Sequence, residues 1–153
     1  MTEDIANPLE AIPASGRIMG LDLGSKTIGV AISDAMRYSA TPLEIIKRTK
    51  FTQDAIRLEQ LIAENDIVAI VLGLPLNMDG SEGPRVQSTR AFARSLSQRI
   101  ELPIAFWDER LSTSAVTRMM IEADLRRDRR AEIVDKLAAS YILQGALDRL
   151  RRH

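Results

Sequence analysis

The 153-residue chain has the length of a single domain, and its apolar fraction of 45% and charged fraction of 27% are ordinary for a soluble globular protein. It contains no cysteine, which excludes disulfides, thiolate nucleophiles and cysteine-based zinc sites, and its one histidine is the last residue, His153. Any hydrolytic chemistry must therefore depend on carboxylates, lysines, hydroxyls or a metal ion.

The net charge is zero, but the charges are unevenly distributed along the chain. Residues 1–109 carry 11 basic and 15 acidic residues, whereas residues 110–153 carry 10 basic and 6 acidic residues. Most of the basic cluster consists of four arginines, Arg126, Arg127, Arg129 and Arg130. Such a cluster is either a solvated junction between helices or a patch that contacts phosphates, and the composition leaves both readings open.

The start of the chain has neither a clear period nor a targeting signal. Residues 1–16 contain acidic residues, two prolines and no basic residue, which is the wrong composition for a signal peptide. The longest apolar run, Ile67–Leu74, is too short to span a bilayer. We therefore expect a flexible N-terminal extension over 1–16, a single domain over 17–153, a cytoplasmic location and no membrane partner.

The periodicity of the remaining sequence predicts a succession of strands and helices. Strands are expected at residues 17–23, 27–33, 41–48, 67–72 and 103–107, and helices at residues 52–64, 86–100, 112–123 and 130–150. A turn at 24–26 joins the first two strands in a hairpin. The later half alternates strands with helices, which implies parallel pairing, so the chain is predicted to form a three-layer α/β domain with a mixed sheet.

Three acidic residues stand out by their position. Asp22 lies near the C-terminal end of the first strand, and Glu109 follows the last strand. Ligands of open α/β sheets bind at the carboxyl ends of parallel strands, so both acids face one crevice if these strands run parallel. Asp135 belongs to an apolar stripe of its helix rather than to the wet face. Asp34 ends the returning strand of the hairpin at the opposite edge, and we interpret it as structural.

Each acid also has a structural alternative. Asp22 could satisfy turn amides around Gly24, and Asp135 could be favoured by the dipole in the early turns of its helix. Glu109 could be an ordinary loop residue, as could Asp108; only one of this pair should enter the crevice, because successive extended residues point to opposite faces, and the pattern does not choose. Converging carboxylates would need a strong cation, and hard oxygen ligands imply Mg²⁺ or Mn²⁺.

Four segments occur in order along the chain: DLGSKTIGVAISD at 22–34, GLPLNMDGSEGP at 73–84, DERLST at 108–113 and VDKLAASYILQ at 134–144. Together they resemble the signature segments of the YqgF family, bacterial proteins also called Holliday junction resolvases or pre-16S rRNA nucleases, over about residues 17–150. The resemblance implies a ribonuclease-H-like three-layer fold, with helices flanking a five-stranded mixed sheet whose second strand is antiparallel. It also implies an acidic triad of Asp22, Glu109 and Asp135, which selects Glu109 over Asp108.

The resemblance further implies a metal-dependent nuclease that processes the 5′ end of pre-16S rRNA or, alternatively, resolves Holliday junctions in branched DNA. A second alternative is a non-catalytic ribosome-assembly or nucleic-acid-binding factor that keeps the fold. Our hypothesis is that the triad holds two Mg²⁺ or Mn²⁺ ions for in-line hydrolysis. Expected partners are structured RNA or branched DNA, with a ribosomal pre-particle as a further candidate, and the sequence does not determine the oligomeric state.

Substrate contacts are expected from a further set of polar side chains: Lys26, Asn77, Arg110, Arg126, Arg127, Arg129 and Arg130. Lys26 could contact a phosphate, and the glycine-containing loop at 77–83 could form a mobile lip beside the crevice. The arginine cluster would position the nucleic-acid backbone rather than read bases. Aromatic residues make up only 4% of the chain, which favours shape recognition of a folded substrate over base stacking.

Overall fold

A computed structural model describes residues 12–111 and 127–151, with side chains described for residues 12–110 and 137–151. The elements follow in the order β1 (Arg17–Leu23), β2 (Thr27–Ser33), β3 (Ala40–Lys47), α1 (Phe51–Asn65), β4 (Ile67–Leu74), α2 (Pro84–Ser97), β5 (Ile104–Asp108), a 3₁₀ turn η1 (Glu109–Leu111) and α4 (Arg127–Arg151). None of the helices in this described part combines the length and the apolar character needed to span a membrane.

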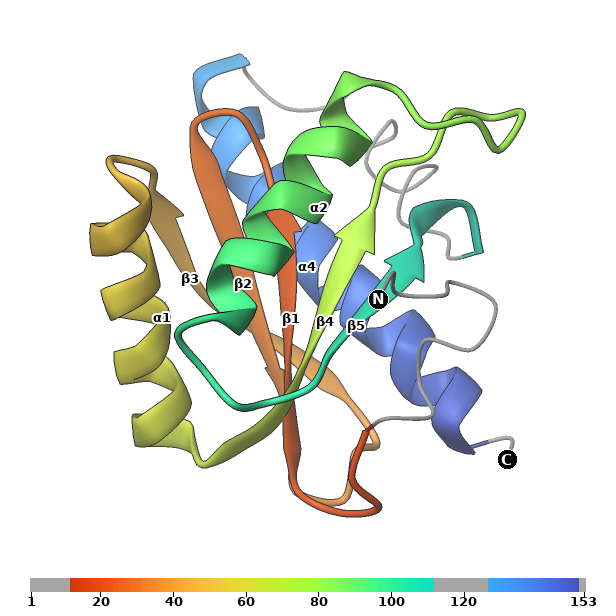
Figure 1. Cartoon of the computed structure of the whole chain (residues 1–153). Coiled ribbons are helices and arrows are strands. Elements are labelled where there is room, and N and C mark those ends of the chain that lie inside the picture. Colours follow the sequence, from red (N-terminus) through yellow and green to blue (C-terminus); the bar gives the residue numbers. More distant parts are fainter. Residues whose placement is uncertain (1–11, 112–126, 152–153) are drawn as a thin grey trace.

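The five strands form one mixed sheet in the order β3-β2-β1-β4-β5. β2 is antiparallel to β1 and β3, whereas β4 is parallel to β1 and β5. Helices α1 and α2 cover one face of the sheet and α4 crosses the other (Figure 1). The predicted three-layer fold, with a five-stranded mixed sheet and an antiparallel second strand, is confirmed.

The predicted boundaries agree closely with the observed elements. β1 and β2 have the predicted bounds, and β3 and β5 are shifted by one residue. α2 begins at Pro84 and ends at Ser97, instead of covering 86–100, because proline suits the first helical turn, where no N–H is needed. The helix expected at 112–123 lies outside the described residues.

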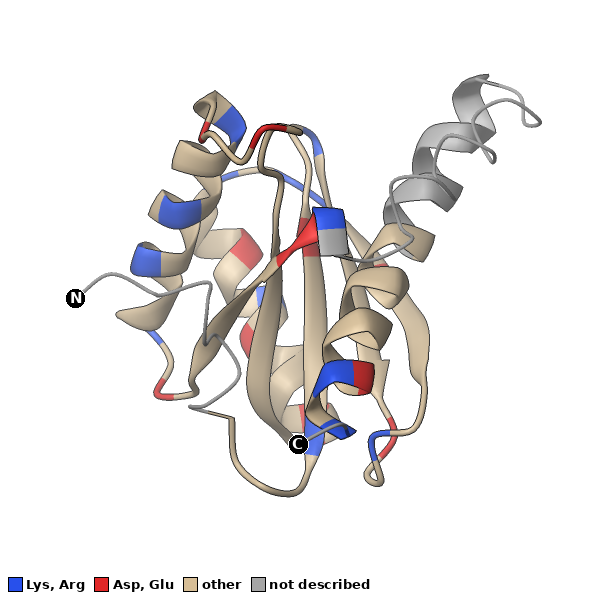
Figure 2. Cartoon of the chain, turned by 90° about the vertical axis from the view of Figure 1, so that its right-hand side faces the viewer, with Lys and Arg blue, Asp and Glu red and all other residues tan. Residues whose placement is uncertain are grey.

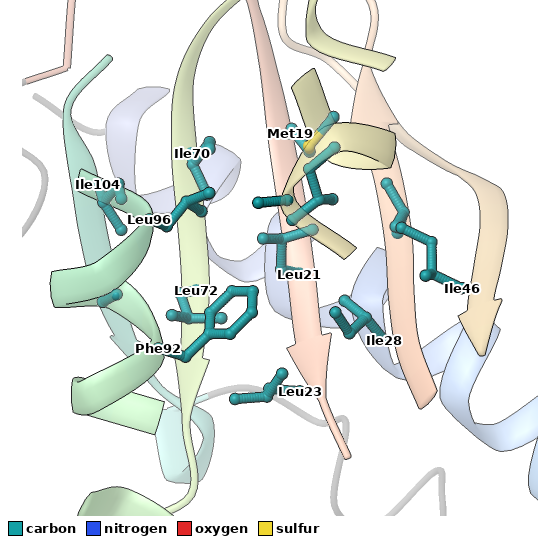
Figure 3. Packing of buried hydrophobic residues seen from close by; sticks show 14 of the residues in the cluster. Met19, Leu21, Leu23, Ile28, Ile46, Ile70, Leu72, Phe92, Leu96 and Ile104 are labelled. Atoms are coloured by element: carbon teal, nitrogen blue, oxygen red, sulfur yellow. The ribbon is translucent and has the colours of Figure 1, made fainter. Parts of the chain in front are cut away.

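The larger core lies between the sheet and helices α1 and α2. Alternate residues of β1 point to this side, including Met19, Leu21 and Leu23, and they meet Phe92 and Leu96 of α2 (Figure 3). Full burial of each large aliphatic side chain stabilises the fold by roughly 1.5–3 kcal/mol. This layer of side chains therefore fixes the position of the strands relative to α2.

The second core lies under α4, which approaches the sheet closely because two strand positions lack a side chain. A Cβ on Gly20 of β1 would lie 2.7 Å from Leu143 Cβ and 3.1 Å from the main-chain oxygen of Ala139. A Cβ on Gly73 of β4 would lie 2.5 Å from Ile142 Cδ1. Glycine inside a strand often marks such an approach, and here it lets α4 come close to the main chain of β1 and β4.

The segment before β1 packs against the domain from residue 12 onward. Ile12 is buried in the core under α4, and the carbonyl oxygen of Gly16 accepts a hydrogen bond from Arg37 Nε at 2.7 Å. The last part of the segment expected to be an extension, residues 12–16, is thus in contact with the domain, because an apolar side chain there can join the core. Residues 1–11 lie outside the described part of the chain.

Asp34 lies at the opposite end of the sheet from Asp22 and braces the turn between β2 and β3. Its Oδ1 accepts hydrogen bonds from the main-chain N–H groups of Tyr38 at 2.8 Å and Ser39 at 3.0 Å. These bonds, that of Ser39 above all, hold the pKa of Asp34 below its ordinary value. Asp34 therefore has the structural role that its position indicated.

Candidate active site

The parallel strands β1, β4 and β5 end at the same edge of the sheet, at the top of Figure 1. Asp22 is the penultimate residue of β1 and is only 3% exposed. Alternation puts it on the same side as Gly20, which is the side that α4 covers. Leu21 pairs with Leu72 of β4, so continuing that register by one residue puts Asp22 beside Gly73, about 4.8 Å away across the sheet.

Glu109 reaches the same place from the end of β5. It is the first residue of the 3₁₀ turn η1, directly after the strand. A Cβ on Gly73 would lie 3.1 Å from Glu109 Oε2, so this carboxylate lies over the main chain of Gly73. Since Ile142 of α4 contacts the same side of Gly73, the carboxylates of Asp22 and Glu109 share the α4 side of the sheet edge.

Asp108 is turned away from this side. Its neighbour Trp107 packs under α4, so alternation directs Asp108 to the opposite face. Its buried carboxylate accepts hydrogen bonds from the main-chain N–H of Arg110 at 2.9 Å and from Arg110 Nη2 at 2.7 Å. The hydrogen bond to Asp108 in turn raises the pKa of Arg110. The two adjacent acids are thus separated, and Glu109 is the one on the side of Asp22.

Asp135 is the ninth residue of α4 and lies in its third turn, and its side chain is outside the described ones. α4 begins at the edge where β1 ends and runs back across the sheet (Figure 1). The main chain of Ala139 lies close to Gly20 of β1, and Asp135 precedes Ala139 by four residues, a rise of about 6 Å along α4. Asp22 is two residues further along β1, about 7 Å. The main chain of Asp135 is therefore roughly level with Asp22.

The loop after β4 is fastened to the end of β5 by Arg110, whose Nη1 donates to the main-chain oxygen of Met78 at 3.3 Å. The loop is closed internally by a hydrogen bond from the N–H of Gly80 to the oxygen of Asn77 at 2.8 Å, and Asn77 Nδ2 donates to Ser81 Oγ at 2.9 Å. The loop expected to form a lip thus lies beside the end of β5, where Arg110 fastens it, and Asn77 stabilises its internal turn. In the view of Figure 2, acidic and basic positions adjoin where β5 ends.

The remaining described residues predicted to contact the substrate lie in the turn after β1 and at the start of α4. Lys26 is exposed in the turn between β1 and β2. Arg127, Arg129 and Arg130 lie in the first turn of α4, with side chains outside the described ones, and Arg126 lies outside the described residues altogether. The structure thus brings Lys26, Asn77 and Arg110 to the edge where Asp22 and Glu109 lie.

Two further basic residues lie at this edge, although no local sequence pattern predicts their position there. Arg48, which follows β3, donates from Nη1 to the main-chain oxygen of Gly24 at 2.6 Å. Arg85, in the first turn of α2, has Nη2 3.5 Å from the main-chain oxygen of Leu23. These contacts join residues 24 and 62 positions apart, which periodicity and short motifs do not connect.

A divalent metal ion suits the donor set at this edge. Asp22 and Glu109 supply carboxylate oxygens on one side of the sheet, the ligand type that Mg²⁺ and Mn²⁺ prefer. Among the described side chains, no group of three or more acidic, histidine or cysteine residues could by itself hold a metal. A complete set of ligands would thus need the third predicted acid, Asp135, or oxygen atoms of the substrate and water.

A mixed sheet of this order, with acidic residues at the carboxyl ends of β1 and β5 and a third acid on the covering helix, defines the class of ribonuclease-H-like nucleases. A family model described as "RuvX: Holliday junction resolvase" matches residues 16–149. The chain therefore belongs to the RuvX family, which is the YqgF family that its motifs resemble.

Curated relatives match the chain over nearly its whole length. A protein from Cereibacter sphaeroides is 65% identical over 148 residues, covering 97% of this chain and 92% of the relative. A protein from Paracoccus denitrificans is 60% identical over 149 residues, covering 97% and 94%. Both carry the name "Putative pre-16S rRNA nuclease". Family and relatives together identify a nuclease, a hydrolase that acts on phosphodiester bonds.

Solved structures show the same fold at low sequence identity. RuvC of T. thermophilus, in complex with a Holliday junction substrate, matches with a TM-score of 0.56 and 14% identity, covering 90% of this chain and 96% of that one. The yeast mitochondrial Holliday junction resolvase matches with a TM-score of 0.50 and 11% identity, covering 97% and 85%. The ribonuclease-H-like fold is thereby confirmed.

Proposed function

We propose that this nuclease hydrolyses phosphodiester bonds in the 5′ region of pre-16S rRNA, at a divalent-metal site formed by Asp22, Glu109 and Asp135. The observation that carries the proposal is the position of the Asp22 and Glu109 carboxylates on one side of the sheet edge, around Gly73. The rRNA substrate is supported by the name that relatives at 60% and 65% identity carry. Such a role implies a cytoplasmic protein that contacts ribosomal pre-particles.

The chain's own residues prepare this edge for hydrolysis without a histidine. Mg²⁺ or Mn²⁺ bound there would act as a Lewis acid and lower the pKa of a bound water. Asp22 is nearly inaccessible to solvent, so its carboxylate is oriented by the protein and its interactions with a cation are weakly screened. Glu109 is held over Gly73, and Asp135 would approach from α4. The three acids repel phosphate, so basic side chains must bring the substrate to them.

Recognition of a folded substrate by its shape is supported by the distribution of aromatic rings. Among the described residues, the aromatic ring with high exposure is that of Tyr38, which lies in the turn between β2 and β3 at the opposite end of the sheet. Bases of a single strand near Asp22 would have no such ring to stack on within the described part of the chain. A structured RNA, bound through its backbone and grooves, suits this surface better.

A second candidate substrate is a four-way DNA junction, because the matching family model carries the description of a Holliday junction resolvase. The same acidic residues would act on either nucleic acid. The two candidates differ in the shape of the substrate and in the pattern of cuts, since a resolvase makes paired, symmetric cuts.

The test is cleavage of a labelled 5′-leader fragment of pre-16S rRNA and of a labelled four-way DNA junction, each with Mg²⁺, Mn²⁺ or EDTA. Wild type is compared with Asp22→Asn and Glu109→Gln, and the matched control is Asp108→Asn, the neighbouring acid on the other face. We expect metal-dependent cutting of the RNA that falls by about 10²-fold or more in Asp22→Asn and Glu109→Gln. Asp108→Asn should stay within about tenfold of wild type.

Other outcomes would redirect the proposal. Paired cuts in the junction alone would replace the rRNA substrate with branched DNA while keeping the site. Undiminished cutting by Glu109→Gln would remove Glu109 from the site. If neither substrate is cut with any metal, processing of these substrates is wrong, and the non-catalytic ribosome-assembly factor becomes the better account.

A further inference from the structure

Arginines on the described surface differ in what their guanidinium groups contact. Five of them face a carboxylate: Arg57 with Glu44, Arg90 with Glu82, Arg99 with Glu59, Arg110 with Asp108 and Arg151 with Asp148. Arg48 and Arg85 instead contact main-chain carbonyl oxygens. Within the described part of the chain, neither of them forms an ion pair, so their positive charges are not neutralised by an acid.

The two carbonyl groups belong to consecutive residues at the end of β1. Arg48 binds the oxygen of Gly24, and Arg85 lies at the oxygen of Leu23, the residue directly after Asp22. Lys26 completes the group, since its main-chain oxygen accepts the N–H of Arg48 at 2.9 Å and its side chain is exposed in the same turn. We call Lys26, Arg48 and Arg85 the basic collar.

The basic collar leaves most of its donors available to a ligand. A guanidinium group carries five N–H donors, and the contacts to Gly24 and Leu23 occupy one nitrogen of each arginine. These contacts also restrict the long side chains, so less conformational entropy is lost when a ligand binds. Three cations concentrated in a stretch of chain that is acidic overall form a local site for anions.

The basic collar and the acidic site lie on the two sides of one strand end. Arg85 belongs to α2, which covers the face of the sheet opposite to α4, whereas Asp22 points towards α4 (Figure 1). Leu23 and Asp22 are adjacent in β1, about 3.3 Å apart along the strand. A nucleic-acid backbone that crosses this end can therefore place one phosphate at the acids and its neighbours at the basic collar.

We propose that Lys26, Arg48 and Arg85 bind backbone phosphates next to the bond that is cleaved. That the bound nucleic acid is cleaved rests on the proposed function. That the basic collar binds phosphates does not. The arginine fork matches the geometry of phosphate oxygens, and the basic collar contacts no base edge by itself, so it positions RNA and DNA alike. Its arginines are positioning residues that supply the attraction the acidic site lacks.

The test measures binding without cleavage, in a Glu109→Gln background and in EDTA, with the labelled rRNA leader and the four-way DNA junction as probes. Affinity is recorded as a function of KCl concentration for this background, for the added pair Arg48→Gln and Arg85→Gln, and for the added control Arg94→Gln. Arg94 is an exposed arginine near the other end of α2, without an ion pair in the described part of the chain and about 13 Å along the helix from Arg85.

We expect the collar pair to weaken binding at low salt by about tenfold or more. The slope of log affinity against log salt concentration should become shallower by about 1.4 to 1.8, the value for two lost phosphate contacts. Arg94→Gln should leave the slope unchanged. Replacing both collar arginines by lysine should keep most of the slope, because the charge is retained.

A purely structural role for these arginines would give a different result. If they only brace the end of β1, the glutamine pair lowers the urea midpoint of unfolding but leaves the salt slope as in the background, and this outcome overturns the proposal. If the pair does not fold, Arg85→Gln is measured alone, since its long contact to Leu23 contributes little to stability. Failure of wild type to cut either probe would count against the proposed function without touching this result.

Discussion

The carboxylate of Glu109 lies over the main chain of Gly73, in the space that a side chain on β4 would fill. A Cβ at Gly73 would be 3.1 Å from Glu109 Oε2 and 2.5 Å from Ile142 Cδ1. Continuing the β1–β4 register by one residue puts the same glycine next to Asp22, so three elements meet at one residue that has no side chain. The geometry of the acidic site therefore depends on the absence of atoms at this position.

Replacement of Gly73 by alanine should impair both stability and cleavage. The added methyl overpacks the contact with α4, which typically destabilises a protein by about 1–3 kcal/mol. It also displaces the Glu109 carboxylate, and a misplaced catalytic group reduces the rate by on the order of 10²-fold. Urea unfolding and the rate of metal-dependent cleavage measure the two effects separately.

A second substitution separates these effects. Ile142→Val in the Gly73→Ala background removes the Cδ1 atom that a Cβ would meet at 2.5 Å and leaves the crowding of Glu109. Stability should recover in part while cleavage stays low. If cleavage recovers together with stability, Gly73 matters only for packing against α4, and the account of Glu109 is wrong.

Arg110 should contribute more to stability than other surface arginines of the chain. Arg110→Gln removes the charged partner of the Asp108 carboxylate, which is 4% exposed and keeps the main-chain N–H of residue 110, and a hydrogen bond to a charged group contributes about 1.5–3 kcal/mol. The matched comparison is Arg99→Gln, whose partner Glu59 is a third exposed, where the loss should be below about 1 kcal/mol. Equal urea midpoints for the two variants would contradict a special role for the Asp108 pair.

The ion pair between Glu44 and Arg57 should make a small contribution to the pH dependence of stability. The hydrogen bond from Arg57, with Nη2 at 2.6 Å, lowers the pKa of Glu44 below its ordinary value of 4.5. The unfolded state then binds the proton more readily, so the contribution is fully present above about pH 4.5 and is lost as the pH falls through the lower folded pKa.

Glu44→Gln isolates this contribution. The difference in urea midpoint between wild type and the variant should be constant above about pH 6 and shrink towards about pH 3. It should be modest throughout, because the two side chains are 30% and 36% exposed and solvent screens the pair. A difference that grows on acidification would reverse the sign of the inferred pKa shift.

Much of this organisation could be predicted from local patterns. The bounds of β1 and β2 follow from a run of β-branched and aliphatic residues broken by a three-residue turn, and both agree with the structure. Asp22 stands at the end of such a strand, and this position predicts it as a site residue. Alternation required that only one of Asp108 and Glu109 enter the crevice, and the structure separates the two as required.

The parts that could not be predicted depend on contacts between distant segments. Which acid of the pair faces α4 is set by where β5 stops pairing and by the turn η1, which periodicity does not reveal. The basic collar needs Arg48 and Arg85 to reach carbonyl groups 24 and 62 residues away. Gly20 and Gly73 did carry a signal, because glycine inside a strand often marks a close approach, although the sequence does not say what approaches.

The most direct test of the acidic site is the binding of Mn²⁺ to the full chain, measured by calorimetric titration without nucleic acid. Wild type, Glu109→Gln and Asp108→Asn are compared, with urea midpoints recorded to confirm that each variant is folded. If Asp22 and Glu109 hold the ion together, Glu109→Gln weakens Mn²⁺ binding by about tenfold or more and Asp108→Asn changes it by less than about threefold. Equal Mn²⁺ affinity in wild type and Glu109→Gln, or a larger loss in Asp108→Asn, would contradict the account.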